Sequence, residues 1–579
     1  MTILGATSLP QFAIGESDYR DLRRGGMTYV DKTLWAADVL GHGAKVHVVP
    51  RPRRFGKTLN MSMLRYFVER TEEDRTSLFE DTAVWTAEGG KYREHFQRYP
   101  TISLSFKDLQ ETTWDGLSVR LAALLAKTLD DVLDRTIAMF PGTEEPAHLA
   151  LLRNRDAPLA RFTDALADLN EWLHVVTGER TIILIDEYDA PLHAAWRHEY
   201  WDTAVGFFRD FLSAGLKDNN HLYKGVLTGI LKVAKEGIFS GLNHPDVATI
   251  LTSHMSSRFG FTEDEVAALA SVTGCPEQLP VMQQWYNGYR FGQVPPHTMY
   301  NPWSILNFLS KHPDAPQAFW KNSSDNGLIR TLLMLHAAAL GPTVEALLLG
   351  QTVQVIVDEN VAMPQLHQSP HTVLELLFYS GYLTATDLEP TTAGLRVSLR
   401  IPNVEVRYVF TAIFGDWLRQ GALSAGAGGG PSPIGQLTHA MLSGDADALE
   451  EQLEERLVTM LSHHDVAGDR VEAVYRAFLV GMLVHLEPTH RVYSNREAGF
   501  GRADVMVVPR QPGPGAVMEL KRITRRETEE LALEKAIAQL TDRDYASEVR
   551  AGGATEVYQY AVVFDGKRCW VRRVESATM

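Results

Sequence analysis

The chain contains 579 residues, of which 45% are hydrophobic and 22% are charged. This composition is typical of folded globular proteins and excludes a wholly disordered or fibrous chain. At about 150 residues per domain, the length predicts roughly three to four domains. The formal net charge of −16 excludes a surface that coats nucleic acid or anionic membrane nonspecifically, so a polyanionic partner has to be bound by a local patch.

Cysteine content and hydropathy indicate the compartment. Cys275 and Cys569 are the two cysteines of the chain, too few for a disulfide framework or a cysteine-based zinc site. The first residues lack the basic segment and apolar core of a secretory signal. The best candidate for a membrane span, 328–340, is shorter than the ~20 apolar residues that a span needs. We therefore expect a cytoplasmic protein with no membrane partner.

Between about residue 12 and residue 260, short apolar runs alternate with longer helical patterns. The strand-like runs are Val46–Val49, Thr101–Leu104, Thr181–Ile185 and Gly225–Thr228. Strands that alternate with helices indicate βαβ units and a buried parallel sheet. This part of the chain is therefore predicted to be an α/β domain.

Changes of composition divide the rest of the chain. Residues 261–420 have a mainly helical pattern, which predicts a helical lid or a small second domain. Residues 421–433 are rich in glycine and serine with flanking prolines, which indicates a flexible linker. The segment 434–579 contains strand-like runs, a helical pattern near 528–540 and a last strand pattern at 557–564. We predict that it is an independent α+β domain.

The first apolar run leads into a phosphate-binding signal. Gly56, Lys57 and Thr58 follow that run and open a helical pattern. Strand, loop and helix in this order bind phosphate, because the loop amides and the helix N-terminus cradle it while a lysine neutralises it. The motif predicts that ATP binds here, with Lys57 at the β and γ phosphates and Thr58 at Mg²⁺. A chance surface loop is the alternative for the tripeptide alone.

Arginines fill the loop before Gly56. Arg51 occupies the position at which the usual motif has its first glycine, and Arg53, Arg54 and Phe55 follow. Positive charge beside the phosphate site would stabilise a transferring phosphoryl group, while a surface patch is the alternative. We predict that Arg53, Arg54, Phe55 and Gly56 belong to the nucleotide-binding loop.

The third apolar run ends in two acids, Asp186 and Glu187. Carboxylates at the C-terminal end of a buried strand occupy the place where α/β sheets bind ligands. We predict that Asp186 holds Mg²⁺ and that Glu187 orients or deprotonates the attacking water. For either acid alone, capping of the next helix is the alternative. Thr228 ends the following strand, where it would sense the γ-phosphate or be an ordinary strand-end residue.

Several short motifs stand in the order found in the bacterial AAA-ATPase-like family, which this chain resembles over about residues 12–410. The motifs are Tyr29–Thr33, Arg51–Thr58, Leu184–Asp189, Phe239–Asn243, Tyr286–Tyr289, Tyr300–Ser304 and Gly381–Thr384. The resemblance implies an AAA-like P-loop ATPase core with a parallel sheet at 1–260. Members of the family commonly carry a C-terminal PD-(D/E)XK nuclease domain.

The C-terminal domain places two carboxylates and a lysine on neighbouring strands. A strand pattern that contains Asp504 is followed by a turn and by a returning strand with Glu519 and Lys521. Side chains two apart on a strand share a face, so Glu519 and Lys521 project together, and a hairpin brings Asp504 beside them. Such a group can hold a hard divalent cation and position a nucleophilic water.

This order resembles the PD-(D/E)XK core, which implies a restriction-endonuclease-like α+β fold. The resemblance assigns Asp504 and Glu519 as Mg²⁺ ligands and Lys521 to orienting the water or stabilising the phosphorane. Glu472 and Gln539 match an acidic residue and a glutamine on two core helices of the superfamily. A salt-bridged hairpin is the alternative for the short motif, and a solvent-facing amide is the alternative for Gln539.

Local charge favours a phosphate-bearing substrate. The segment from Arg491 to Arg526 has a net charge of +5 within a chain of net charge −16. A run of solvated strand and helix ends is the alternative interpretation. Within this segment, Glu497 would join the metal site or cap a loop.

Together these motifs predict an enzyme that binds and hydrolyses ATP and carries a Mg²⁺-dependent nuclease domain. DNA or RNA would be its substrate, and defence or mobile-element handling its setting. Two alternatives stay open: a nucleotide-gated binding or assembly switch whose nuclease-like domain is inactive, and an ATPase that acts only on protein partners. An arginine supplied by a neighbouring copy would imply a homo-oligomer formed through the ATPase domain.

Overall fold

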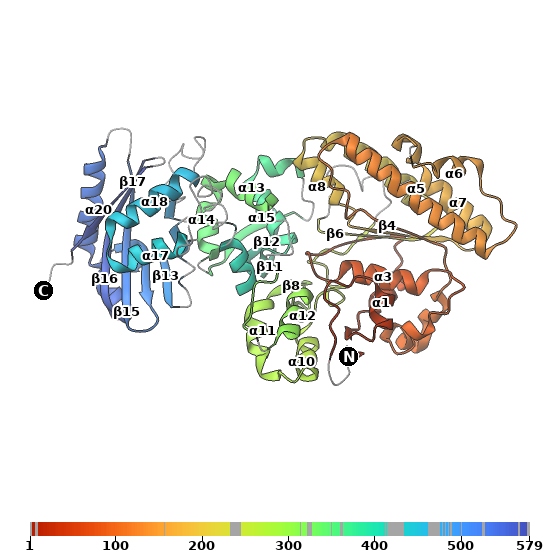
Figure 1. The fold of residues 1–579 in the computed structure, drawn as a ribbon, viewed down its shortest axis with the longest axis horizontal. Coiled ribbons are helices and arrows are strands. Elements are labelled where there is room, and N and C mark those ends of the chain that lie inside the picture. The colour runs from red at the N-terminus through yellow and green to blue at the C-terminus, as the bar shows by residue number, and fades with distance from the viewer. Residues whose placement is uncertain are drawn as a thin grey trace. The chain divides into compact units, whose positions relative to one another are not determined.

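The computed structural model describes most of the chain, which forms two compact units (Figure 1). The first unit is Met1–Asn322 with Val355–Glu405, and the second is Ser323–Gln354 with Val406–Met579. The residues that it does not describe are 1–2, 6–9, 156, 232–244, 313, 321–326, 349, 359–362, 412, 414–432, 461–474, 477–478, 481, 484–485, 487–488, 499–500, 524–526, 566–567 and 576–579.

A five-stranded parallel sheet forms the centre of the first unit. Its strand order is β4, β5, β6, β3 and β7, and all four neighbouring pairs run parallel. The strands are β3 Val46–Pro50, β4 Thr101–Ser105, β5 Thr181–Asp186, β6 Leu222–Gly229 and β7 Asp246–Val247. Every residue of β3 and β5 is buried, which explains why these strands are continuous apolar runs. The predicted parallel sheet of P-loop type is confirmed.

Helices cover both faces of this sheet. Figure 1 shows α5 and α7 on one side and α1 and α3 on the other. These helices are α1 Tyr19–Arg24, α3 Lys57–Val68, α5 Trp114–Met139 and α7 Ala165–Thr177. The sequence of α5 explains its docking, because leucines recur on one helical face and are buried there. They are Leu117, Leu121, Leu125, Leu129 and Leu133.

Shorter elements complete the first unit and the segment that follows it. The helices are α2 Leu34–Gly41, α4 Ala83–Thr86, α6 Ala147–Leu152, α8 Ala190–Arg197, α9 Trp201–Leu216, α10 Glu263–Val272, α11 Leu279–Tyr286, α12 Pro302–Lys311 and α15 Pro370–Tyr379. The strands are β1 Ile3–Leu4, β2 Tyr29–Val30, β8 Tyr289–Phe291, β9 His297–Met299, β10 Val353–Val357, β11 Thr384–Thr391 and β12 Gly394–Arg400. The segment 261–420, predicted to be mainly helical, therefore also contains two small sheets, and its residues are divided between the two units.

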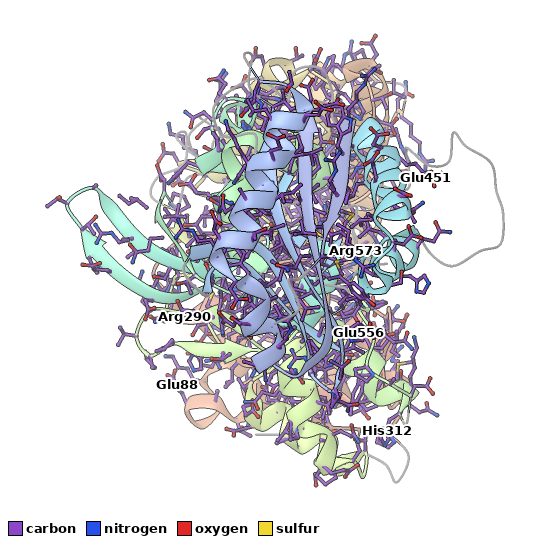
Figure 2. All side chains as sticks on the ribbon, turned by 90° about the vertical axis from the view of Figure 1, so that its left-hand side faces the viewer. Glu88, Arg290, His312, Glu451, Glu556 and Arg573 are labelled. Carbon is purple, nitrogen blue, oxygen red and sulfur yellow. The ribbon has the colours of Figure 1, made fainter. Side chains whose placement is uncertain are left out.

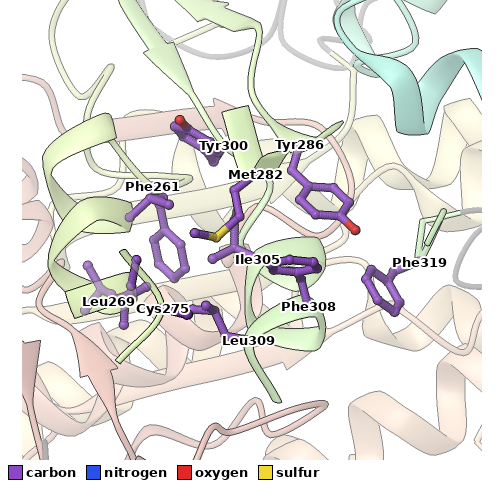
Figure 3. Close-up of a cluster of buried hydrophobic side chains, with 13 residues drawn as sticks. Phe261, Leu269, Cys275, Met282, Tyr286, Tyr300, Ile305, Phe308, Leu309 and Phe319 are labelled. Carbon is purple, nitrogen blue, oxygen red and sulfur yellow. The ribbon is translucent and has the colours of Figure 1, made fainter. Parts of the chain in front are cut away.

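Helices α10, α11 and α12 enclose a hydrophobic cluster of their own, drawn in Figure 3. Its labelled members are Phe261, Leu269, Cys275, Met282, Tyr286, Tyr300, Ile305, Phe308, Leu309 and Phe319. A capping box starts α10, since the Thr262 hydroxyl accepts the Glu265 N–H and the Glu265 carboxylate accepts the Thr262 N–H.

A buried ion pair ties the motif Tyr29–Thr33 to this cluster. Lys32 Nζ lies 2.7 Å from Glu265 Oε2 and also donates to the Ser257 carbonyl at 2.9 Å. Burial lowers the pKa of Lys32, and the nearby Glu265 carboxylate opposes that shift. Removing one partner would leave an uncompensated charge in the interior, so the pair penalises any arrangement that separates this motif from α10.

A mixed five-stranded sheet forms the centre of the second unit. Its strands follow chain order from β13 to β17, and the pair β15 and β16 is parallel while the other three pairs are antiparallel. The strands are β13 His490–Ala498, β14 Gly501–Pro509, β15 Gly513–Arg522, β16 Ala554–Asp565 and β17 Arg568–Val574. Its helices are α13 Gly327–Leu335, α14 Ala337–Leu348, α17 Pro433–Ser443, α18 Ala446–Met460, α20 Glu529–Arg543 and α21 Tyr545–Ala551.

Figure 2 shows how helices flank this second sheet. Glu451 marks α18 on one side of the strands that carry Glu556 and Arg573, and α20 lies on the other side. Leu533, Ala536 and other residues of α20 and α21 pack with residues of β14, β15 and β16 in one buried cluster. The predicted hairpin and helix are confirmed as β14, β15 and α20, and the predicted strand 557–564 is β16. It is not the last strand, because β17 follows it.

Other predictions fall outside the described residues. These are the motif Phe239–Asn243, the acidic residue Glu472 and the linker 421–433 except for Pro433, which starts α17. The side chain of Glu497 is also outside the description. Among the helices of the described segments, none is long and apolar enough to cross a membrane.

The buried carboxyl group of Glu405 makes the stability of the fold depend on pH. Both of its buried carboxylate oxygens accept from the Ser304 hydroxyl, at 2.9 and 2.7 Å, and Oε1 accepts the Trp320 N–H at 2.9 Å. Desolvation outweighs these bonds and raises the pKa of Glu405 to about 7. Because the folded state binds this proton more tightly than the unfolded state, the stability it contributes is complete below the unfolded pKa and is lost as the pH rises through about 7.

We expect the free energy of unfolding to fall by about 3 kcal/mol between about pH 5 and pH 8 through this group alone. Urea denaturation across that range measures the fall. Glu405→Gln should show a shallower decline, whereas the exposed Glu389→Gln should behave as the wild type. Equal pH dependence in all three proteins would contradict the assignment.

Candidate functional site

The phosphate-binding motif occupies the loop between β3 and α3. Gly56 caps α3 with a φ of +84°, a left-handed conformation that favours glycine. Lys57 is only 7% exposed, and its Nζ donates to the carbonyls of Arg51 at 3.0 Å and Pro52 at 2.9 Å. Burial lowers the pKa of Lys57, and the carboxylates of Glu187 and Asp186 oppose that shift. Thr58, in the first turn of α3, is half-buried.

Residues far along the chain pack against this loop. The buried Phe55 ring packs against Tyr289, with centroids 5.0 Å apart, and the Arg54 guanidinium lies 4.5 Å from the centre of the Trp303 ring. A Cβ on Gly381 would lie 2.8 Å from Pro52 Cβ, so a larger residue there would displace the loop. The motifs that contain Tyr289, Trp303 and Gly381 therefore support the P-loop from behind.

Arg51 lies in neither of its two expected places. Its side chain is 0% exposed and donates to the carbonyls of Pro50, Ala248 and Met255. The same guanidinium lies 5.2 Å from the Phe259 ring centre. It acts as an internal brace, because its donors are directed at backbone carbonyls. Arg53 is half-buried.

The structure brings Asp186 and Thr228 together at the C-terminal ends of β5 and β6. The Thr228 hydroxyl donates to Asp186 Oδ1, which also accepts the Glu187 N–H at 3.0 Å. Desolvation raises the pKa of Glu187, and the Lys57 ammonium opposes the rise. Glu187 has a φ of +52°, a costly conformation for a residue with a side chain. The predicted acids therefore surround Lys57, as the motif requires.

Asp189 is a functional neighbour that the sequence interpretation missed. Its Oδ2 accepts the N–H groups of Ile230 at 2.8 Å and Leu231 at 3.0 Å. A Cβ on Gly229 would lie 2.6 Å from Asp189 Oδ1, so this position needs glycine. Asp189 therefore locks the chain after β6 to the acidic end of β5. Its place at the end of the motif Leu184–Asp189 was the available signal.

The predicted carboxylate group of the second unit also assembles. Residues Val505 and Met518 are opposite each other in the β14 and β15 hairpin, which brings Asp504 beside Glu519. Asp504 Oδ2 accepts the Leu520 N–H at 2.9 Å, and Lys521 Nζ donates to Glu519 Oε1 at 2.7 Å.

The two carboxylates of this group lie close together, and Glu519 is buried. Glu519 is 1% exposed, and no described residue donates a hydrogen bond to its buried Oε2. Desolvation, followed by the charge of Asp504, raises the pKa of Glu519. Two adjacent buried carboxylates with free coordination capacity fit a hard divalent cation such as Mg²⁺.

Two further residues join this group from α20 and α21. Gln539 Nε2 lies 3.4 Å from the Tyr545 hydroxyl, and the charge of Glu519 raises the pKa of Tyr545 after the larger effect of burial. Gln539 is half-buried and not a fully solvent-facing amide. The structure therefore places the predicted glutamine at the edge of the carboxylate group.

Arg476 is a neighbour of Asp504 that the sequence interpretation missed. Its Nη1 donates to Asp504 Oδ1 at 3.0 Å, and its Nε donates to Glu345 Oε1 at 3.3 Å. The Ser494 hydroxyl also donates to Glu345, which is on α14. Because Glu345 lies 131 residues before Arg476, no local spacing indicates the pair.

Comparisons with known proteins match the two segments that contain these residues. Residues 13–239 match the family model described as predicted AAA-ATPase, and residues 470–574 match that of the PD-(D/E)XK nuclease superfamily. The family resemblance is confirmed for both segments. The AAA-ATPase-like match covers the P-loop and the acidic strand, and the PD-(D/E)XK match covers Asp504, Glu519 and Lys521.

Similar whole proteins add little about activity. The chain is 26% identical over 404 residues, 69% of each protein, to an uncharacterised protein encoded in the vnfD 5′ region of Azotobacter chroococcum mcd 1. A Walker-type ATPase of Pyrococcus abyssi aligns with 69% of this chain and 97% of its own at 14% identity, with a TM-score of 0.34. Similarity at that TM-score does not strengthen the fold assignment.

The bond between Thr228 and Asp186 can be tested by removing one hydroxyl. Thr228→Val keeps the shape and leaves Asp186 with one donor fewer, so we expect a loss of about 1–3 kcal/mol in stability. Misplacement of Asp186 should lower ATP turnover on the order of tenfold, which corresponds to ~1.4 kcal/mol of activation free energy.

Thr181→Val is the matched control, because Thr181 Oγ1 donates to Asn170 Oδ1 at 2.6 Å at the opposite end of β5. It should lose similar stability and keep the wild-type rate in a phosphate-release assay. If both variants hydrolysed ATP at the same rate, the Thr228 hydroxyl would have no part in the reaction.

Proposed function

We propose that the chain hydrolyses ATP at the P-loop of its AAA-ATPase-like domain and cleaves phosphodiester bonds of nucleic acid at its PD-(D/E)XK-type domain, predicted to span 434–579. The observation that carries the proposal is that Asp504 lies beside the buried Glu519, whose Oε1 accepts from Lys521 and whose Oε2 has no hydrogen-bond donor among the described residues. An arrangement of this kind is costly for folding alone, because it buries like charges together. Cation binding offsets that cost.

In the ATPase domain, the residues present fit a nucleotide with Mg²⁺. Lys57 would neutralise the β and γ phosphates, and Thr58 and Asp186 would hold the metal. Glu187 has a raised pKa, which makes it a stronger base for the attacking water. Thr228 donates a hydrogen bond to Asp186 and so fixes its carboxylate, and Arg53 and Arg54 would supply positive charge beside the phosphates.

In the nuclease-like domain, Mg²⁺ held by Asp504 and Glu519 would supply Lewis-acid activation of the scissile phosphate. Lys521, whose ammonium lies 2.7 Å from Glu519 Oε1, would orient the water and stabilise negative charge on the phosphorane. Gln539 would position the water or the phosphate from α20.

The contact of Arg476 with Asp504 favours a second candidate, a nucleotide-gated switch whose nuclease-like domain binds nucleic acid or protein without cleaving it. A guanidinium 3.0 Å from Asp504 Oδ1 competes with a metal ion for that oxygen. Cleavage activity distinguishes the two candidates, since only the first requires Asp504 to release Arg476 and bind Mg²⁺.

For the ATPase site, we expect Lys57→Ala to lower ATP turnover roughly 100-fold, because it removes the cation that stabilises the transferring phosphoryl group. The exposed Lys217→Ala is the control and should keep the wild-type rate. Phosphate release and circular dichroism measure activity and folding together. A folded Lys57→Ala protein with an unchanged rate would exclude the P-loop assignment.

For the nuclease-like site, wild-type protein with Mg²⁺ should cut single- or double-stranded DNA or RNA in a substrate panel, with and without ATP. Asp504→Ala should abolish cleavage, because a metal ligand is lost, while the exposed Asp542→Ala should cut normally. Cleavage that survives Asp504→Ala would refute the assignment. Nucleic-acid binding without cleavage by any variant would favour the switch.

A further inference from the structure

A group of histidines and one carboxylate lies at the edge of the parallel sheet, apart from the residues proposed to bind nucleotide. His42 follows the last residue of α2, and His47 is the second residue of β3. Asp246 starts β7 and is the direct partner of His47 in the parallel register. His254 follows in the turn after β7.

The distances in this group suit metal ligation. One ligand atom from each of His42, His47 and Asp246 lies within 4.8 Å of the other two. Asp246 Oδ2 is 3.0 Å from His47 Nδ1 and 3.0 Å from His254 Nε2. The His42 ring lies 5.3 Å from the His47 ring and 5.7 Å from the His254 ring, measured between centroids.

His47 is the buried member of this group. Its side chain is 0% exposed, its Nδ1 is bonded to Asp246, and its buried Nε2 has no hydrogen-bond partner among the described residues. A metal ion between His47 Nδ1 and Asp246 Oδ2 would take the place of the proton in this contact.

We propose that His42, His47 and Asp246 bind a divalent transition-metal ion, with Zn²⁺ as the expected ion and His254 as a further ligand or outer partner. Imidazole nitrogen with a carboxylate oxygen is a ligand set that Zn²⁺ favours, whereas Mg²⁺ and Ca²⁺ prefer oxygen alone. Ligation through His47 Nδ1 would place the metal on the side of the ring that faces Asp246.

The surroundings hold the ligands in place. Lys224 Nζ donates to the carbonyls of His42 and Ala44 and so fixes the turn that carries His42. His42 is exposed, and its Nδ1 accepts only a long bond of 3.2 Å from the Ala44 N–H. Its ring can therefore turn a nitrogen to a metal at little cost.

The site would clamp the strand that leads into the P-loop. It joins the end of α2, β3 and β7, and β3 continues directly into Arg51. Arg51 binds the Ala248 and Met255 carbonyls, which follow Asp246 and His254 by two residues and one residue. The metal and Arg51 would thus hold the same segment against β3, which makes the site structural.

Cobalt titration of the purified full-length chain tests the proposal. After chelator treatment, one equivalent of Co²⁺ should produce the intense visible bands of a four-coordinate site with nitrogen ligands, in the presence of excess Mg²⁺ to occupy carboxylate sites. Zn²⁺ should displace the bands and raise the thermal midpoint. His42→Ala and Asp246→Asn should bind Zn²⁺ about 10- to 100-fold more weakly.

His42→Ala changes an exposed residue, so its folding is not at risk even where His47→Ala fails to fold. His148→Ala is the matched control, because His148 is an exposed histidine 3.6 Å from a carboxylate oxygen of Asp168. It should keep the bands and the wild-type affinity. Absence of the bands in the wild type, or bands of equal intensity in His42→Ala and Asp246→Asn, would overturn the proposal.

Discussion

Parallel pairing of β3, β5 and β6 is the constraint on which the ATPase-like unit depends. Parallel strands end at the same edge of a sheet, so Pro50, Asp186 and Gly229 reach that edge together. The loop after β3 supplies Lys57, and the tips of the other two strands supply a carboxylate and the hydroxyl that binds it. A register shift of one residue in β6 would turn Thr228 away from Asp186, because successive side chains face opposite sides of a strand.

Several buried charges among the described residues have specific partners. Arg51 donates to backbone carbonyls, and Lys32 pairs with Glu265. Asp504 pairs with Arg476 and accepts a backbone N–H. Such contacts contribute little net stability compared with apolar packing, but they penalise every arrangement in which a partner is missing. They therefore help to select one geometry around each site. The two sites share this property although their folds differ.

Much of the fold and part of each site were predictable from sequence, because local pattern decides them. The buried strands are continuous apolar runs, and the spacing of Glu519 and Lys521 fixes their common face. Burial of Arg51 was not predictable, since its acceptors lie about 200 residues further along the chain. The contact between Arg476 and Glu345 was unpredictable for the same reason, and so was the group formed by His47 and Asp246. No spacing motif joins the members of either group.

The packing of distant residues against the P-loop has a consequence for synthesis of the protein. Tyr289, Trp303 and Gly381, which support Phe55, Arg54 and Pro52, leave the ribosome long after the loop itself. The first unit is also discontinuous, because Ser323–Gln354 belongs to the second unit and is made before Val355–Glu405. The nascent chain therefore cannot complete the nucleotide site domain by domain from its N-terminus. The loop therefore gains its last supporting residue only after part of the second unit has already been translated.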